Sequence, residues 1–145
     1  MFQCVGDRIA VLMQKARQQG PDELGPAEVE QRYGIPPAIV PDFIALRGDP
    51  SDGLPGAKGI GEKTAADLLR RHGSLEAAIA GAIREKPSVR RALLEQADEL
   101  RAFKDIATLR DADVERPPDR PTDRAGGAQA AGELGMGRLA ERLSG

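Results

Sequence analysis

Residues 46–69, "LRGDPSDGLPGAKGIGEKTAADLL", are the stretch that decides the fold of this chain. Aspartates, glycines, prolines and lysines lie there between two segments whose apolar residues have helical spacing. The upstream segment predicts a helix over 41–47. The downstream segment predicts a helix over 62–73, which ends in a basic turn followed by a glycine. The sequence therefore predicts two helices joined by a long, glycine-rich loop.

The remainder of the chain also favours helices. Apolar spacing and helix-start residues predict helices over 26–34, 74–83 and 87–109. By contrast "RIAVLM", residues 8–13, is rich in β-branched and apolar side chains and predicts one short strand. A single strand is not stable without neighbours, so we expect its pairing partners to lie on sequence outside this chain. The predicted fold is mainly α.

The domain organisation predicted from these patterns has four parts. The parts are a strand-bearing segment 1–18, a helical domain 19–114, a flexible connector 115–132 rich in proline and glycine, and a terminal helix within 133–145.

Composition limits the class of protein. With 145 residues the chain can form one domain with a core and a tail. Aromatic residues make up 3%, too few for base stacking on aromatic platforms. The single Cys4 excludes an internal disulfide and argues against a zinc site. No apolar run approaches the roughly 20 residues of a membrane span, so we predict a cytoplasmic protein with no membrane partner.

Charge is distributed unevenly along the chain. The net charge is −2, yet residues 56–91 hold eight Lys or Arg against four Asp or Glu. This segment carries +4, and the rest of the chain carries −6. A basic block on an acidic chain indicates a nucleic-acid partner, although a solvated helix face would have the same composition.

The tract "GAKGIGEKT" resembles two nucleotide-binding motifs but matches neither. Glu62 separates Gly61 from Lys63, so the spacing of a P-loop is off by one, and no apolar strand precedes it. A dinucleotide fingerprint would need a third glycine where Thr64 stands. The tract better fits a hairpin between helices, in which Gly59 and Gly61 adopt positive φ and the intervening isoleucine wedges into the helix pair.

Such a hairpin predicts a phosphate site. Backbone N–H groups from Gly59 to Lys63 would lie at the start of the 62–73 helix, where unpaired donors and the helix dipole favour an anion. Lys58, Lys63 and Thr64 could add contacts that carry no base specificity. The alternative is an ordinary connecting turn that needs glycine.

Asp49 and Asp52 are candidate metal ligands. One helical turn at this spacing brings both carboxylates to one side, and hard oxygen ligands suit Mg²⁺ or Mn²⁺. Turn and helix-cap chemistry would use the same residues. Two carboxylates are too few for a two-metal phosphodiesterase site.

The stretch that contains both aspartates and the hairpin resembles a known protein family. "LRGDPSDGLPGAKGIGEKTAADLLRRHGSLE", residues 46–76, resembles the helix-hairpin region of the bacterial 5′-3′ exonucleases, which include the N-terminal domain of DNA polymerase I and the flap endonucleases. "MFQCV", "QRYGIPPAIVPDFIALRGD" and "LGMGRLAERL" also look like that family. The resemblance implies that Asp49 and Asp52 belong to a metal cluster, although Gly53 stands where the family usually has Asn.

The resemblance also implies a DNA grip. The hairpin of that family holds duplex DNA, with K⁺ on its backbone carbonyls, and maps onto Gly59, Gly61, Lys63, Thr64 and Ala65. Family members carry a preceding α/β nuclease half that supplies the other carboxylates. We therefore expect this chain to be the C-terminal part of such an enzyme, with a strand left over from a truncated α/β nuclease domain and no activity by itself.

Two main function classes follow from the sequence. The first is part of a metal-dependent 5′-3′ exonuclease acting on duplex DNA with a 5′ end or flap. The second is a non-catalytic helix-hairpin-helix DNA-binding module. A protein-interaction domain using the 87–109 helix is a third class, which an absence of DNA binding would favour.

Overall fold

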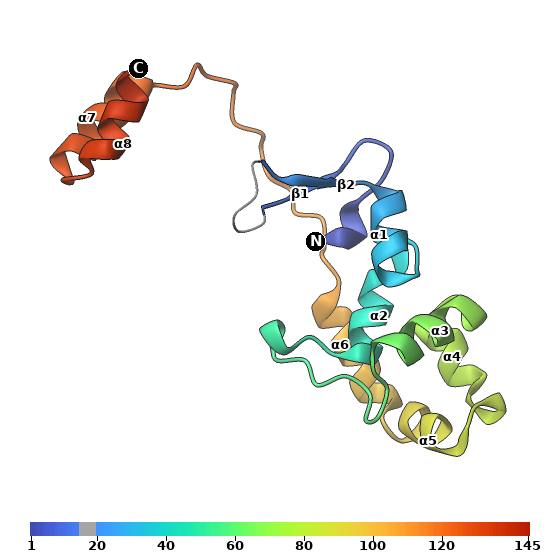
Figure 1. The fold of residues 1–145 in the computed structure, drawn as a ribbon. Coiled ribbons are helices and arrows are strands. Elements are labelled where there is room, and N and C mark those ends of the chain that lie inside the picture. The colour runs from blue at the N-terminus through green and yellow to red at the C-terminus, as the bar shows by residue number, and fades with distance from the viewer. Residues whose placement is uncertain (15–19) are drawn as a thin grey trace. The chain divides into compact units, whose positions relative to one another are not determined.

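The computed structural model describes residues 1–14 and 20–145, and it divides into two compact units, 1–111 and 112–145 (Figure 1). The predicted boundary between residues 18 and 19 lies outside the described residues. The elements of the first unit are β1 Val11–Met13, β2 Asp22–Leu24, α1 Pro26–Tyr33, α2 Val40–Arg47, α3 Glu62–His72, α4 Leu75–Ala80, α5 Pro87–Glu95 and α6 Ala97–Ala107. The second unit contains α7 Arg124–Glu133 and α8 Gly137–Ser144. The mainly α prediction is confirmed.

Helix α2 forms the centre of the first unit, with α3, α4 and α6 packed against it (Figure 1). Most of its residues are buried, and Phe43, Ala45 and Leu46 are almost completely excluded from solvent. A helix that is apolar on nearly all sides is stable only inside a core. The loop that follows α2 therefore starts from a fixed point in the protein.

The N-terminal strand has a partner within the chain. β1 pairs antiparallel with β2, with Val11 opposite Leu24 and Met13 opposite Asp22. The sequence predicted no strand over residues 22–24, and the pairing partners were expected outside the chain. Asp22 and Glu23 give this strand no apolar alternation, so the usual sequence signal of a strand is missing.

The predicted 87–109 helix is interrupted. The structure ends α5 at Glu95 and begins α6 at Ala97, with Gln96 between them at φ −108° and ψ 15°. The Gln96 side chain accepts a hydrogen bond of 2.8 Å from the backbone N of Lys58. A contact across 38 residues therefore accompanies the break, and no local signal announces it.

The predicted connector 115–132 needs a correction, because its second half is helical. α7 begins at Arg124, where the Asp123 side chain accepts a hydrogen bond from the backbone N of Gly126. Aspartate is a preferred helix N-cap, and this cap offsets part of the low helix propensity of the paired glycines. A Cβ added at Gly127 would lie 3.5 Å from Leu143, so the small residues of α7 allow close packing of α8.

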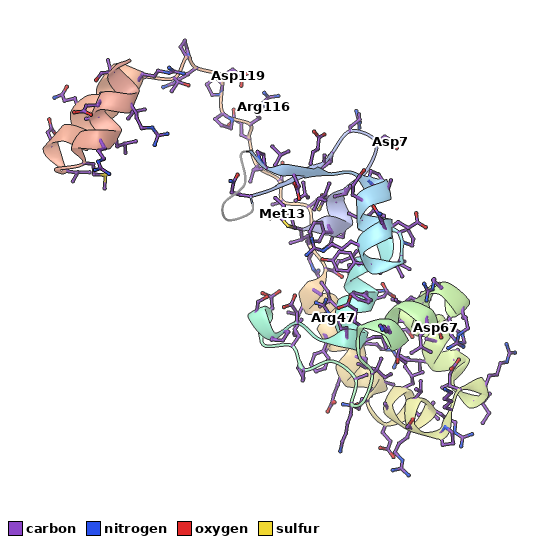
Figure 2. All side chains as sticks on the ribbon, in the orientation of Figure 1. Asp7, Met13, Arg47, Asp67, Arg116 and Asp119 are labelled. Atoms are coloured by element: carbon purple, nitrogen blue, oxygen red, sulfur yellow. The ribbon has the colours of Figure 1, made fainter. Side chains whose placement is uncertain are left out.

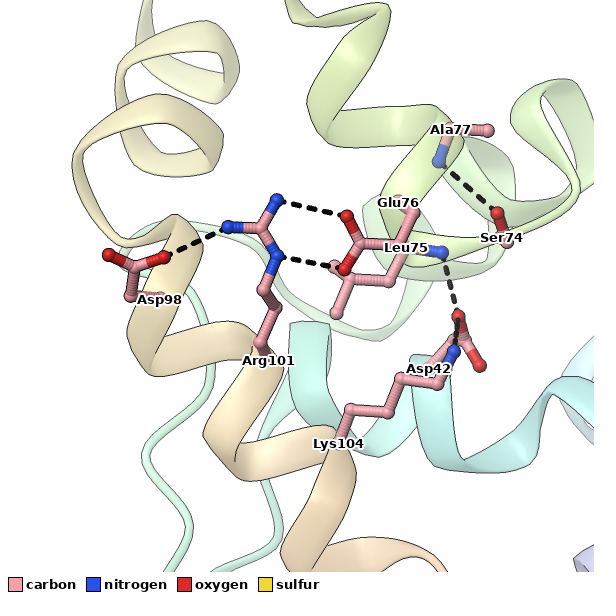
Figure 3. A network of polar contacts seen from close by, with 8 residues as sticks. All are labelled: Asp42, Ser74, Leu75, Glu76, Ala77, Asp98, Arg101 and Lys104. Carbon is pink, nitrogen blue, oxygen red and sulfur yellow. Dashed lines mark hydrogen bonds and ion pairs between the residues drawn. The ribbon is translucent and has the colours of Figure 1, made fainter.

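A polar network joins three helices of the first unit (Figure 3). Asp42 on α2 is 3% exposed, and its Oδ1 accepts hydrogen bonds from the backbone N of Leu75 at 2.7 Å and from Lys104 Nζ at 2.9 Å. Close by, the guanidinium of Arg101 on α6 donates to both carboxylate oxygens of Glu76 at 2.9 Å. The carboxylate of Asp42 thus ties the start of α4 and the middle of α6 to α2.

We expect Asp42→Ala to lower the free energy of unfolding by about 2 kcal/mol, because Leu75 N and Lys104 Nζ lose a charged acceptor. Urea unfolding followed by circular dichroism measures this. Asp98→Ala is the control: its side chain is 98% exposed, and its ion pair with Arg101 should contribute less than about 1 kcal/mol. Equal losses in the two variants would contradict the structural role of Asp42.

Candidate functional site

The segment between α2 and α3 begins with a closed loop, residues 48–56, which we call the aspartate loop. Two hydrogen bonds join Asp49 and Leu54, from Asp49 N to Leu54 O at 2.8 Å and from Leu54 N to Asp49 O at 2.9 Å. At the base of the loop, the backbone of Gly56 runs against that of Gly48: a Cβ on Gly56 would lie 2.4 Å from Gly48 N. Only two glycines allow this approach, so they fix where the aspartates are held.

The two aspartates lie at the first turn of this loop: Asp49 in the bridge that closes the loop, and Asp52 in the turn beyond it. Asp49 caps the 3₁₀ turn Pro50–Asp52, and its Oδ1 accepts hydrogen bonds from Ser51 N at 3.0 Å and Ser51 Oγ at 2.6 Å. Asp52 is exposed. Both aspartates line one pocket of about 260 Å³. The one-turn spacing therefore does bring them to a common site.

The surroundings of Asp49 favour its ionised form. The hydrogen bond from the Ser51 hydroxyl is the largest effect that lowers the pKa of Asp49, and the nearby Arg47 guanidinium lowers it further. Arg47 Nη2 lies 3.9 Å from Asp49 Oδ2, and Arg47 Nη1 lies 3.9 Å from Glu62 Oε2 at the start of α3. Arg47, labelled in Figure 2 at the end of α2, thus links the aspartate loop to the next helix.

The same pocket has an apolar wall. Its other lining residues are Met1, Phe2, Tyr33, Val40, Phe43, Ile44, Arg47, Ile106, Ala107 and Leu109. Rings of Phe2 and Phe43 flank Tyr33, with centroids 5.5 Å and 5.6 Å from its own. The start of the chain, the end of α2 and the end of α6 therefore meet beside the two carboxylates.

The donor set at this pocket is suited to part of a metal site. Carboxylate oxygens are the ligands that Mg²⁺ and Mn²⁺ prefer. Within residues 1–14 and 20–145, no three His, Cys, Asp or Glu side chains gather closely enough to hold a metal ion. Asp49 and Asp52 could supply some of the ligands of one ion, and the others would have to come from elsewhere.

The hairpin that follows has the predicted outline, with one correction. Gly59 adopts φ +78°, and Ile60 is 3% exposed within the core, as predicted. Gly61 is different: it lies at φ −90° and ψ −177°, an extended conformation open to any residue. Nothing approaches within 4 Å of a Cβ built there, so Gly61 leaves open space rather than relieving backbone strain.

Backbone donors at the start of α3 are left available. Gly61 is the N-cap and has no side chain to accept a hydrogen bond from the first turn. In the described part of the chain, no hydrogen bond engages the N–H of Gly59 or Gly61. Lys63 stands exposed on this first turn, beside the partly exposed Thr64. These donors and the positive end of the helix dipole suit an anion.

Four of the five predicted DNA-contact residues line two neighbouring hollows, and Gly61 lines neither. Gly59, Lys63 and Thr64 line a groove of about 370 Å³ together with Lys86 and Ser88, which are not among the site residues predicted from the sequence. Lys58 lines a different hollow with Gln96. Only folding brings 86–88 beside the hairpin, so spacing in the sequence gave no signal for them.

His72, in the last turn of α3, takes part in an ion-pair cluster. Its Nε2 lies 2.8 Å from Glu85 Oε1. Arg71 binds both oxygens of the same carboxylate, and these contacts lower the pKa of Glu85 to about 2. Glu85 is thus ionised at neutral pH and joins the end of α3 to the segment before α5.

Comparison with known proteins identifies the family of this domain. The family model described as "5′-3′ exonuclease, C-terminal SAM fold" matches residues 35–123, which include the aspartate loop and the hairpin. The chain therefore belongs to the family of 5′-3′ exonuclease C-terminal domains. Helices α7 and α8 lie beyond the matched region.

Individual relatives agree with this assignment. The chain is 40% identical over 132 residues to a protein named thermostable DNA polymerase I from Thermus aquaticus, covering 86% of this chain and 15% of that protein. It is 53% identical over 73 residues to a 5′-3′ exonuclease of Mycobacterium tuberculosis, covering 48% of this chain and 23% of the relative. The chain thus spans less than a quarter of either relative.

None of the helices within residues 1–14 and 20–145 combines the length and the apolar character of a membrane-spanning segment.

Proposed function

We propose that this chain is the DNA-binding C-terminal part of a metal-dependent 5′-3′ exonuclease or flap endonuclease, working in the cytoplasm. The observation that carries the proposal is that the aspartate loop and the hairpin follow one another between the same two helices, α2 and α3. The aspartate loop leaves the end of α2, and the hairpin directly after it leads into the uncapped start of α3. Carboxylates for a metal ion and donors for a phosphate are thereby held on one rigid connection.

The hairpin binds the backbone of duplex DNA in this proposal. The free N–H groups of Gly59 and Gly61 and the side chains of Lys63 and Thr64 contact phosphate, while Lys58 adds charge from the adjoining hollow. Such contacts position the protein but do not distinguish bases. K⁺ on the carbonyls of the hairpin is part of the proposal by family resemblance. The expected substrate is duplex DNA with a 5′ end or flap.

Asp49 and Asp52 hold Mg²⁺ or Mn²⁺ together with carboxylates from a preceding nuclease half. The bound metal supplies activation of water and stabilisation of the charge that develops on the phosphate oxygens. Met1 and Phe2 line the pocket of the two aspartates, so residues joined ahead of Met1 in a longer protein would enter beside them. This placement supports a site completed by both halves.

A non-catalytic DNA-binding module is the second candidate. It is favoured by the small number of acidic ligands, because the described residues bring only Asp49 and Asp52 to the pocket. Both candidates bind DNA. Divalent-ion binding that requires Asp49 and Asp52 in the joined protein would favour the exonuclease, and its absence would favour the module.

The DNA-binding proposal is tested by the salt dependence of affinity. Replacing Lys63 with Ala should reduce the slope of log affinity against log salt by roughly 0.9, which is one phosphate contact. Fluorescence anisotropy with a short blunt duplex measures the slope. Arg8→Ala is a control of equal charge change on the exposed N-terminal turn, and it should leave the slope unchanged. Absence of any binding by the unaltered chain would refute the proposed function.

A further inference from the structure

The groove beside the hairpin extends past the residues that the proposed function uses. Gly59, Lys63 and Thr64 come from the hairpin and the start of α3, and Lys86 and Ser88 come from the segment that begins α5. Asp67, Arg71, Glu85 and Val89 complete the lining. A groove of about 370 Å³ lined by lysines from two separate segments has room for more than one phosphate group.

The segment that carries Lys86 is anchored to α3 by Glu85. This carboxylate is 7% exposed and lies between the Arg71 guanidinium and the imidazole of His72. Its contact with Arg71 engages both carboxylate oxygens, the geometry in which an Arg–carboxylate pair is most directional. Lys86 is the next residue in the chain, so its backbone position is fixed relative to α3.

Packing around His72 tightens the same anchor. A Cβ added at Gly81 would lie 2.7 Å from His72 Cε1, so the turn after α4 runs directly against the imidazole. Ala82 is completely buried, and Val89 packs partly against the core. Both ends of the segment that carries Lys86 are therefore held.

The two lysines keep their charge free for a ligand. Arg71 is committed to Asp67, labelled on α3 in Figure 2, and to Glu85. Within the described residues, neither Lys63 nor Lys86 forms an ion pair. Both acidic residues of the groove are therefore paired with Arg71. Three basic and two acidic side chains line the groove, which leaves it a net charge of +1 and two lysines without an ion-pair partner among residues 1–14 and 20–145.

We infer that Lys86 and Ser88 bind a second phosphate of the same duplex whose backbone the hairpin holds, with Glu85 as the positioning residue for Lys86. The inference rests on the proposed DNA-binding function and extends its contact surface from α3 to α5. It requires one phosphate contact from Lys86 beyond that of Lys63.

The test uses the full chain and a short blunt duplex. Lys86→Ala should reduce the salt slope by roughly 0.9 and weaken binding about eightfold at 0.1 M salt. The double variant with Lys63→Ala should lose roughly 1.8 in slope. Arg84→Ala is the matched control. Arg84 carries the same charge as Lys86, lies two residues before it, is exposed and does not line the groove.

Glu85→Gln separates positioning from simple stabilisation. In this background, Lys86→Ala should change the slope clearly less than in the unaltered chain, because Lys86 is no longer held at the groove. A merely structural Glu85 would lower the unfolding midpoint and leave the Lys86 increment unchanged, which would refute its positioning role.

The outcomes distinguish this inference from the function on which it rests. If Lys63→Ala lowers the slope and Lys86→Ala acts like Arg84→Ala, the hairpin site stands and the second phosphate contact is refuted. If the chain binds no duplex, both fail. Backbone amide NMR shifts at Ser88 and Val89 on adding duplex give a second readout, and unshifted signals there would also overturn the inference.

Discussion

In a protein that joins this chain to an upstream nuclease half, Asp49→Asn and Asp52→Asn should each lower the rate of 5′-flap cleavage by roughly 10²–10³-fold or more. In the proposed function, each change would remove a charged ligand of the metal ion that activates water. Duplex affinity should stay nearly unchanged, because the hairpin contacts lie in a different hollow. Single-turnover cleavage and anisotropy on the same flapped duplex measure the two quantities.

The structure supplies suitable controls for this experiment. Asp7→Asn removes an exposed carboxylate outside the pocket and should leave the cleavage rate unchanged. The 145-residue chain alone, in Mg²⁺ or Mn²⁺, should show no flap cleavage, because two carboxylates cannot hold the metal ions required. Robust cleavage by the chain alone that depends on Asp49 and Asp52 would show that the count of missing ligands is wrong.

Among the substitutions predicted here to lower stability, Gly56→Ala should have the largest effect, a decrease of about 2–5 kcal/mol in the free energy of unfolding. Gly56 lies at φ +72°, and an added Cβ would meet Gly48 N at 2.4 Å and Arg47 C at 2.5 Å. Because both obstacles are backbone atoms, no side-chain rotation relieves the clash. The base of the aspartate loop has to open, as urea unfolding and a loss of metal binding in the joined protein should show.

Gly53→Ala is the matched control for this effect. Gly53 has a similar φ of +70°, but nothing lies within 4 Å of a Cβ built there. The substitution should cost only the left-handed backbone conformation, about 1–2 kcal/mol. Equal losses at Gly53 and Gly56 would mean that the close approach of Gly48 and Gly56 does not hold the loop.

The sequence was most informative where structure depends on neighbouring residues. Gly73 ends α3 in the left-handed conformation, as the glycine after the basic last turn predicted. Gly34 ends α1 in the same way, and Ser74 caps α4. The spacing of Asp49 and Asp52 also foretold that they share a pocket. These features follow from caps, turns and one-turn spacing, which act over a few residues and are visible in the sequence itself.

Some local predictions failed because several backbone solutions fit the same residues. Gly61 was expected at positive φ, but it is extended and leaves open space at the start of α3. The polar strand Asp22–Leu24 lacks alternation, and the Asp123 cap of α7 lies in a tract dominated by proline and glycine. Composition indicated neither a strand nor a helix there, whereas pairing and capping selected a strand and a helix.

By itself, the sequence determined two helices around a glycine-rich connection, a pair of aspartates one turn apart, and a basic hairpin at a helix start. Only the tertiary structure decided that Gln96, between α5 and α6, accepts a hydrogen bond from the backbone N of Lys58, and that Lys86 lines the same groove as Lys63. The physical reason is that helix caps and one-turn spacing depend on interactions between residues that are close in the sequence. Grooves and buried ion pairs arise from residues far apart in the chain, whose meeting is set by the packing of the whole core around α2.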